Sequence, residues 1–197
     1  LAPPAVAQPP VRVAIIIDDL GNNLVLGRAA IALPAPLTYS VLPLRPYSGT
    51  LARHAAAQGK EVMLHLPMEA GRDRPMGPGG LHRAMDRETF RRQLAASLDD
   101  VPHVAGVNNH MGSVLTRQPQ AMRWLMQDLG CHGDLYFIDS RTDVRTVARR
   151  IAREAGLANA QRDVFLDNDT DPDYVRAQID RLVARARQRG SAIGIGH

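Results

Sequence analysis

The segment that decides the fold is VRVAIIIDDLGNN, residues 11–23. Its first seven residues are mostly β-branched and apolar, which is typical of a buried strand. Two carboxylates, Asp18 and Asp19, follow at once, and a Gly-Asn-Asn turn then leads into a helical pattern. A strand that passes through a short polar turn into a helix is the building unit of a parallel α/β sheet.

The same unit recurs along the rest of the chain. Further apolar runs predict strands at residues 37–42, 61–64, 104–107, 135–138, 163–166 and 191–196. Amphipathic patterns predict helices at residues 22–32, 48–58, 86–98, 118–129, 143–155 and 172–189. Asp86, Asp143 and Asp171 stand where three of these helices need an N-cap. Seven strands alternating with helices fit either a barrel-like closure or an open, doubly wound sheet.

A single domain is expected after a short linker. Residues 1–10, LAPPAVAQPP, hold four prolines and no charge, which predicts a Pro/Ala-rich extended linker. The domain then covers residues 11–197. No helix follows the seventh strand before His197, so we expect the domain to be C-terminally incomplete in this chain. The long irregular segment 70–81 is expected to be a functional loop.

Composition argues against several classes of protein. The net charge is +4, but the arginines are spread beside Asp and Glu without a basic cluster interleaved with aromatics, so nucleic-acid binding is not expected. No apolar run reaches the roughly 20 residues of a membrane span, so no transmembrane segment is expected. Cys131 is the only cysteine. An internal disulfide and a cysteine-based zinc site are therefore excluded, and Cys131 is expected to be buried.

Ionisable side chains follow six of the seven predicted strands. These are Asp18, Asp19, His65, His110, Asp139, Asp167, Asp169 and His197. Parallel strands bring their C-terminal ends to one edge, where α/β active sites lie. Two histidines and a carboxylate would suit Zn²⁺ or a similar divalent ion and leave a position open for water.

Other chemistries stay open at this point. The long spacings carry no local metal signature such as HExxH, so they do not decide for or against a metal. A serine triad is conceivable with Ser113 or Ser140, although neither lies in a nucleophile-elbow sequence. Asp18 and Asp139 could instead form a paired-carboxylate glycosidase site. One of the two adjacent aspartates could also merely cap the helix that follows.

Six motifs together resemble a known family, the divergent polysaccharide deacetylases. They are IIIDDLGNN (15–23), MLHLPME (63–69), GVNNHMGS (106–113), FIDSRT (137–142), FLDND (165–169) and GIGH (194–197). This family consists of bacterial envelope proteins that are distantly similar to NodB-type carbohydrate esterases. The resemblance implies an α/β fold, a distorted (β/α) barrel with about seven parallel strands. It also implies a periplasmic or cell-envelope location and a polysaccharide substrate.

The resemblance further implies roles for individual residues. Asp18 would be the general base, and Asp19 and His65 would bind Zn²⁺ or another divalent metal. The family's second metal histidine falls at Glu69 in this chain, and His110 is the expected replacement. His197 would be the general acid. If that mechanism operates, Asp139 could orient His197 or hold its charge. The Arg-containing third motif of the true deacetylases is replaced here around NNHMGS.

Two functions follow from these expectations. The first is a metal-dependent hydrolase that removes acetyl groups from an envelope polysaccharide. The second is a catalytically silent binding or scaffold protein of the cell envelope on the same fold. A water-occupied metal position beside Asp18 would distinguish them.

Overall fold

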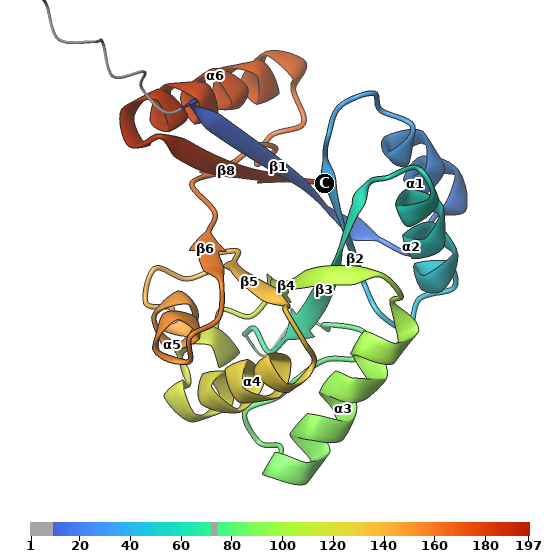
Figure 1. Ribbon diagram of the computed structural model, residues 1–197, viewed down its shortest axis with the longest axis vertical. Coiled ribbons are helices and arrows are strands. Elements are labelled where there is room, and N and C mark those ends of the chain that lie inside the picture. Colours follow the sequence, from blue (N-terminus) through green and yellow to red (C-terminus); the bar gives the residue numbers. More distant parts are fainter. Residues whose placement is uncertain (1–9, 72–74) are drawn as a thin grey trace, which may run out of the picture.

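The fold is a curled sheet of eight parallel strands with helices on its outer side (Figure 1). The computed structural model describes residues 10–71 and 75–197, so the predicted linker lies outside the described residues except for Pro10. The strand order is β6-β5-β4-β3-β2-β1-β8-β7. The strands are β1 (Arg12–Leu20), β2 (Thr38–Val41), β3 (Glu61–Met68), β4 (Val104–Met111), β5 (Tyr136–Asp139), β6 (Asn159–Gln161), β7 (Val164–Phe165) and β8 (Ser191–Gly196).

The sheet curls far enough that its two edge strands are neighbours in the chain. Only Arg162 and Asp163 separate β6 from β7, which lie at opposite ends of the strand order. The Arg162 N–H donates to the carbonyl of Asp139 in β5, whereas the Asp163 N–H donates to that of Ile193 in β8. The result is an open barrel, which confirms the predicted α/β barrel-like fold. The sequence analysis missed β6, which has only three residues.

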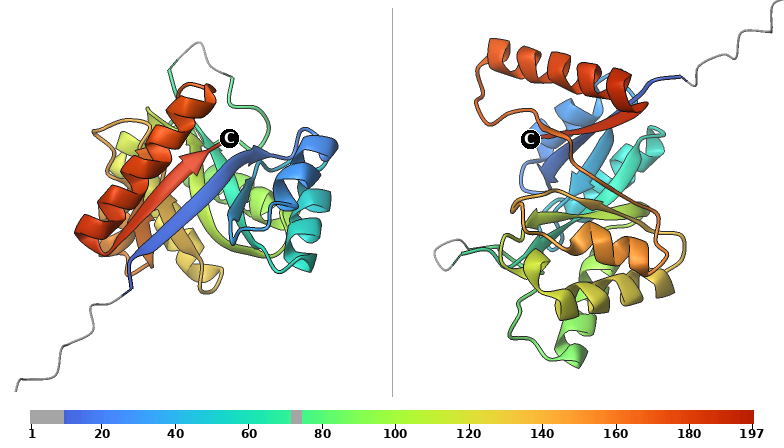
Figure 2. Two further views of the ribbon diagram at one scale, coloured as in Figure 1. Left: turned by 90° about the horizontal axis from the view of Figure 1, so that it is seen from above. Right: turned by 90° about the vertical axis from the view of Figure 1, so that its left-hand side faces the viewer.

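Six α-helices cover the outer side of the sheet (Figure 2). They are α1 (Leu24–Ile31), α2 (Ser48–Ala57), α3 (Arg87–Asp100), α4 (Pro119–Cys131), α5 (Ala148–Glu154) and α6 (Pro172–Arg189). The largest apolar core lies between the sheet and α1 to α5, and a smaller one lies under α6. Within the described residues, no helix is long and apolar enough to cross a membrane.

The helix caps match the predictions in part. Asp86 and Asp171 cap α3 and α6 as predicted. The Asp143 prediction was wrong, because its side chain closes a turn onto Arg145 and α5 begins only at Ala148. Cys131 is exposed rather than buried. These differences lie at helix ends, where local hydrogen bonds compete with helix formation.

The interior of the open barrel is closed by a layer of apolar side chains. Ile16, Met63, Ile138 and Ile195 pack together there, from β1, β3, β5 and β8. Because side chains alternate across a strand, the residue two positions later points to the same side. Asp18, His65, Ser140 and His197 are those residues. This apolar layer is therefore the floor of a polar site at the C-terminal edge of the sheet.

Candidate metal centre

Asp19 reaches the site through an irregularity in β1. Strict alternation would turn Asp19 to the outer side of the sheet, opposite Asp18. The pairing of β1 with β2 shifts register between Ile17 and Leu20, and Asp19 has a φ of 62°. A register shift of this kind re-aims side chains, and Asp tolerates the left-handed conformation better than most residues. Both neighbouring carboxylates therefore face His65.

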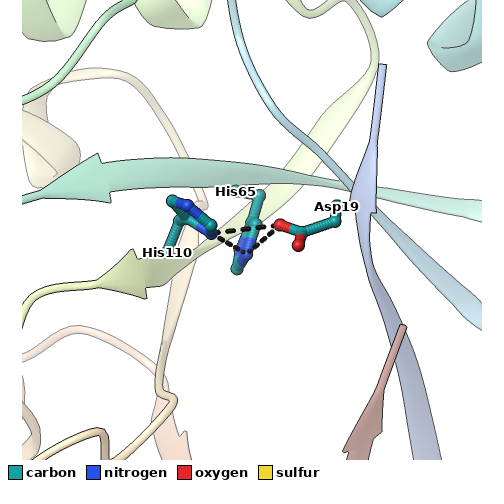
Figure 3. Close-up of side chains that lie close together, drawn as sticks. All are labelled: Asp19, His65 and His110. Carbon is teal, nitrogen blue, oxygen red and sulfur yellow. Dashed lines mark hydrogen bonds and ion pairs between the residues drawn. The ribbon is translucent and has the colours of Figure 1, made fainter. Parts of the chain in front are cut away.

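Three side chains, from β1, β3 and β4, converge at the C-terminal edge of the sheet (Figure 3). One ligand atom each of Asp19, His65 and His110 lies within 4.8 Å of the other two. The Asp19 Oδ1 atom is 3.3 Å from His65 Nε2 and 3.0 Å from His110 Nδ1. The two imidazole nitrogens are 3.1 Å apart. The structure thus brings together the three residues expected to bind a metal.

A buried amide, Asn108, fixes the orientation of His65. The Asn108 Oδ1 atom accepts hydrogen bonds from Ser40 Oγ and from His65 Nδ1, both at 2.7 Å. The Asn108 Nδ2 group donates to Asp18 Oδ1 at 2.8 Å. Since Nδ1 of His65 carries the proton in this network, the lone pair of Nε2 is directed at His110 and Asp19. Sequence analysis missed Asn108, although it lies two residues before His110 on the same strand face.

The donor set fits a divalent metal. Asp19 Oδ1 is buried and has no hydrogen-bond partner among the described residues, which is uncommon for a carboxylate oxygen. It faces two imidazole nitrogens, so three lone-pair donors surround one point. Two histidines and one carboxylate are a usual set for catalytic Zn²⁺. A cation between them would satisfy the carboxylate oxygen and relieve the close approach of the imidazoles.

The charges in this cluster depend on one another. Burial raises the pKa of Asp19, but the neighbouring imidazoles of His110 and His65 outweigh burial and hold that pKa well below its usual range. Burial lowers the pKa of His65, but the carboxylates of Asp18 and Asp19 outweigh it and raise the pKa above its usual value. The cluster therefore binds positive charge, either as a proton on an imidazole or as a metal ion.

His197 directly follows β8 and is held by Asp167. The Asp167 carboxylate accepts the His197 backbone N–H at 2.6 Å and lies 3.3 Å from the imidazole Nδ1. The other ring nitrogen, Nε2, is 3.9 Å from Asp19 Oδ2. Phe165 packs edge-on against the His197 ring, with ring centroids 5.3 Å apart. Phe165 lies in β7 and Asp167 lies two residues later, so both point to the inner side.

The structure does not bring Asp139 to His197, which differs from the expected role of Asp139. Strand β5 directs Ile138 and Ser140 inward, so Asp139 points outward beside α5. Its carboxylate accepts hydrogen bonds from the Arg141 N–H and the Thr146 hydroxyl, both at 2.8 Å. Asp139 is fully buried and braces the loop after β5. This position also leaves Asp18 without the carboxylate partner that a glycosidase pair requires.

Glu69, which replaces the family's second metal histidine, and the two serines of the possible triad lie in other environments. Glu69 pairs with Arg83 through its side chain and receives the Arg83 N–H at 2.8 Å, so it braces the 81–83 segment. Ser113 and Ser140 both line the pocket described below, but among the described residues neither hydroxyl forms a hydrogen bond with a histidine. A serine triad therefore has no geometric support.

A pocket of about 590 Å³ opens above the cluster, and we call it the metal pocket. Asp18, His65 and His110 line the wall formed by β1, β3 and β4, and Phe165, Asn168 and His197 line a second wall formed by β7, β8 and the residues that follow them. Arg141 and Arg162 also line the pocket. Part of the long loop contributes through Ala70 and Gly71, whereas residues 72–74 lie outside the described residues. The pocket is large enough for a sugar with an acyl group.

The comparisons with known proteins agree with this geometry. The model of the divergent polysaccharide deacetylase family matches residues 15–197. The chain belongs to this family. An uncharacterized protein of Haemophilus influenzae and the uncharacterized protein YibQ of Escherichia coli K12 are each 36% identical over 186 residues, 94% of this chain.

This chain spans only part of those relatives, 66% and 58% of their respective lengths. A crystal structure of an uncharacterized protein from Agrobacterium tumefaciens C58 has the same fold. It superposes with a TM-score of 0.90 over 98% of this chain and 79% of that one, at 25% identity. The barrel-like fold and the family are thereby shown.

Proposed function

We propose that this protein is a metal-dependent hydrolase that removes acetyl groups from a polysaccharide of the cell envelope. The observation that carries the proposal is the buried, unpartnered Asp19 Oδ1 atom, which faces His65 and His110 beside a second carboxylate, Asp18. Asp19, His65 and His110 would hold Zn²⁺ or another divalent ion. Such an ion supplies Lewis acidity for amide hydrolysis.

Asp18 is placed to act as the general base. The hydrogen bond from Asn108 engages only its Oδ1 atom, and Oδ2 lies 3.6 Å from His65 Nε2. Asp18 also lines the metal pocket while being only 5% exposed. A carboxylate that is fixed on one side and faces the pocket on the other can take a proton from an attacking water.

His197 is placed to act as the general acid. Asp167 holds the imidazole through Nδ1 and the backbone, so the Nε2 side faces Asp19 across the pocket. A proton on that imidazole could pass to the departing amine of the sugar. The base follows β1 and the acid follows β8, its neighbour in the sheet, and both line the metal pocket.

The test combines zinc binding with acetate release. Protein stripped of metal is titrated with Zn²⁺, and acetate released from N-acetylated chitohexaose is measured before and after loading. We expect one zinc ion per chain and acetate release only after loading. Zinc binding without acetate release from any acetylated glycan would favour the scaffold alternative, and absence of zinc binding would remove the metal assignment.

A further inference from the structure

A second pocket, of about 330 Å³, lies beside the metal pocket and is rich in arginine. We call it the arginine pocket. Four of the eight residues that line it are Arg141, Arg149, Arg150 and Arg153. The one acidic residue in its lining is Asp139, whose carboxylate already accepts hydrogen bonds from Arg141 N–H and Thr146. Positive charge therefore exceeds negative charge in this pocket.

Most of this positive charge is not neutralised within the chain. Arg150 pairs with Glu154 at 2.7 Å. Among the described residues, no ion pair is found for Arg141, Arg149 or Arg153. Arg149 and Arg153 are one turn apart on α5, where like charges repel each other and destabilise a helix. A bound anion would relieve this repulsion.

Arg141 joins the two pockets, because it lines both. Its backbone has a φ of 51°, an uncommon conformation for a residue other than glycine. The hydrogen bond from its N–H to the buried Asp139 carboxylate holds the backbone there. The strained conformation places Arg141 at the boundary between the metal pocket and the arginine pocket. A ligand could therefore extend past Arg141 from one pocket to the other.

The nearby wall of the metal pocket also offers hydrogen-bond donors. Arg162 donates through Nε to the Ser140 carbonyl at 2.7 Å and through one terminal nitrogen to the Arg141 carbonyl at 3.1 Å. Burial, together with the charge of Arg141, lowers the pKa of Arg162 below its usual value. Ser140 Oγ, in a residue only 6% exposed, lines the metal pocket without a hydrogen-bond partner among the described residues.

The metal pocket offers little aromatic surface on which a neutral sugar could stack. Among the described residues, Phe165 is the one aromatic ring in its lining besides the imidazoles. The Arg162 guanidinium lies 5.0 Å from the centre of that ring, and the His197 ring packs against its edge. Hydrogen bonds and charge must therefore provide most of the recognition.

We infer that the ligand of this protein is an anionic glycan whose sugar carboxylates bind Arg141, Arg149 and Arg153 while its acetylated amine lies in the metal pocket. Arginine binds carboxylates through paired hydrogen bonds, and Arg149 and Arg153 on one face of α5 suit successive groups along a chain. The position of the acetylated amine rests on the proposed function. The position of the carboxylates rests on the arginine pocket alone.

The test compares two hexasaccharides that both contain N-acetylglucosamine. Hyaluronan hexasaccharide carries a glucuronate in every disaccharide, whereas chitohexaose is neutral. In calorimetric titrations at low salt, we expect hyaluronan to bind about tenfold more tightly, because two partly exposed charge pairs contribute together on the order of 1 kcal/mol or more. Added salt should remove this difference.

Matched variants locate the binding site. Arg149→Gln/Arg153→Gln should reduce hyaluronan affinity to that of chitohexaose. Arg181→Gln/Arg187→Gln removes the same charge from exposed positions on α6 and should leave the affinity unchanged. Circular dichroism confirms that both variants are folded.

Three results would overturn the inference. The first is equal affinity for the two hexasaccharides. The second is an equal loss of hyaluronan affinity in the two double variants. The third is binding of oligo-dT that is as tight as that of hyaluronan and depends equally on Arg149 and Arg153. The last result would assign the surface to nucleic acid. Acetate release from chitohexaose, measured on the same samples, reports on the proposed hydrolase independently of the arginine pocket.

Discussion

The two walls of the metal pocket differ in how firmly their side chains are held. On the wall formed by β1, β3 and β4, the Asp18 and His65 side chains are at most 4% exposed and Asn108 links them, whereas the Asp19 side chain is 39% exposed. On the second wall, the His197 side chain is 39% exposed, and its neighbouring carboxylates are Asp167 at 3.3 Å and Asp19 at 3.9 Å. A buried, connected wall suits a metal centre of fixed geometry, whereas an open wall suits a group that meets the substrate.

The largest effect is expected from the metal ligands. His65→Ala/His110→Ala removes two of the three donors, so the variant should bind no zinc at stoichiometric concentration. His103→Ala/His132→Ala removes two exposed histidines outside the pocket and should bind one zinc ion per chain. Metal analysis after gel filtration measures both, with circular dichroism as the check on folding. Full zinc content in the first variant would refute the proposed ligand set.

The next largest effect concerns the difference between Asp18 and Asp19. Asp18→Asn keeps the shape of the side chain but removes the base, so acetate release should fall on the order of a hundredfold or more. Its zinc content should stay near that of the wild type. Asp19→Asn should lose zinc first, because Asp19 Oδ1 is the unpartnered oxygen at the cluster. If Asp18→Asn loses zinc and Asp19→Asn retains it, the two roles are exchanged.

Much of this site follows from the period-two alternation of the strands. The apolar residues Ile16, Met63 and Ile195 point inward, and the same alternation sends Asp18, His65 and His197 to the inner face at the strand ends. The inward position of Asp18, His65 and His197 can be predicted from the sequence once the inward face of each strand is known. The position of Asp19 could not be predicted, because it depends on a register shift and a positive φ that no residue pattern indicates.

Asn108 shows a second limit of sequence reasoning. A neutral amide carries no chemical signal of its own, and its neighbour Asn109 looks the same in the sequence. In the structure, Asn108 joins His65 to Asp18, whereas Asn109 accepts the Ser140 N–H and donates to the Met111 carbonyl. The difference comes from alternation, because the two neighbours point to opposite sides of β4.

Substitutions of Asn108 and Asn109 test whether Asn108 orients His65, and their expected effect on zinc affinity is of intermediate size. Asn108→Ala frees the His65 ring and leaves Ser40 without its acceptor, so zinc affinity should fall about 10- to 100-fold, as for other partners of metal ligands. Asn109→Ala removes a similarly buried amide that contacts no ligand and should lower stability without changing zinc affinity. Competition with a chelating dye measures the affinity, and thermal unfolding measures the stability. Equal zinc affinities in the two variants would contradict the role of Asn108.

The smallest effect is expected on the second wall, where Asp167 rather than the predicted Asp139 holds His197. Both aspartates follow short strands, and sequence alone favoured Asp139 as the partner of His197. In β5, however, Phe137 belongs to the outer core and Ile138 to the interior, so Asp139 has the outward direction. In β7, Val164 and Leu166 face α6, which leaves Phe165 and Asp167 on the inner side.

Asp167→Asn should therefore reduce kcat for acetate release about tenfold while zinc content stays unchanged, because the amide cannot stabilise a protonated imidazole as a carboxylate does. Asp139→Asn should leave kcat nearly unchanged and lower the free energy of unfolding by about 1–3 kcal/mol, since a fully buried carboxylate loses its hydrogen bonds to Arg141 and Thr146. Steady-state kinetics and urea unfolding on both variants separate the two effects. A kinetic loss in Asp139→Asn together with normal kinetics in Asp167→Asn would restore Asp139 as the residue that orients His197. It would also mean that the open wall rearranges when substrate binds, because β5 directs Asp139 away from the pocket in this structure.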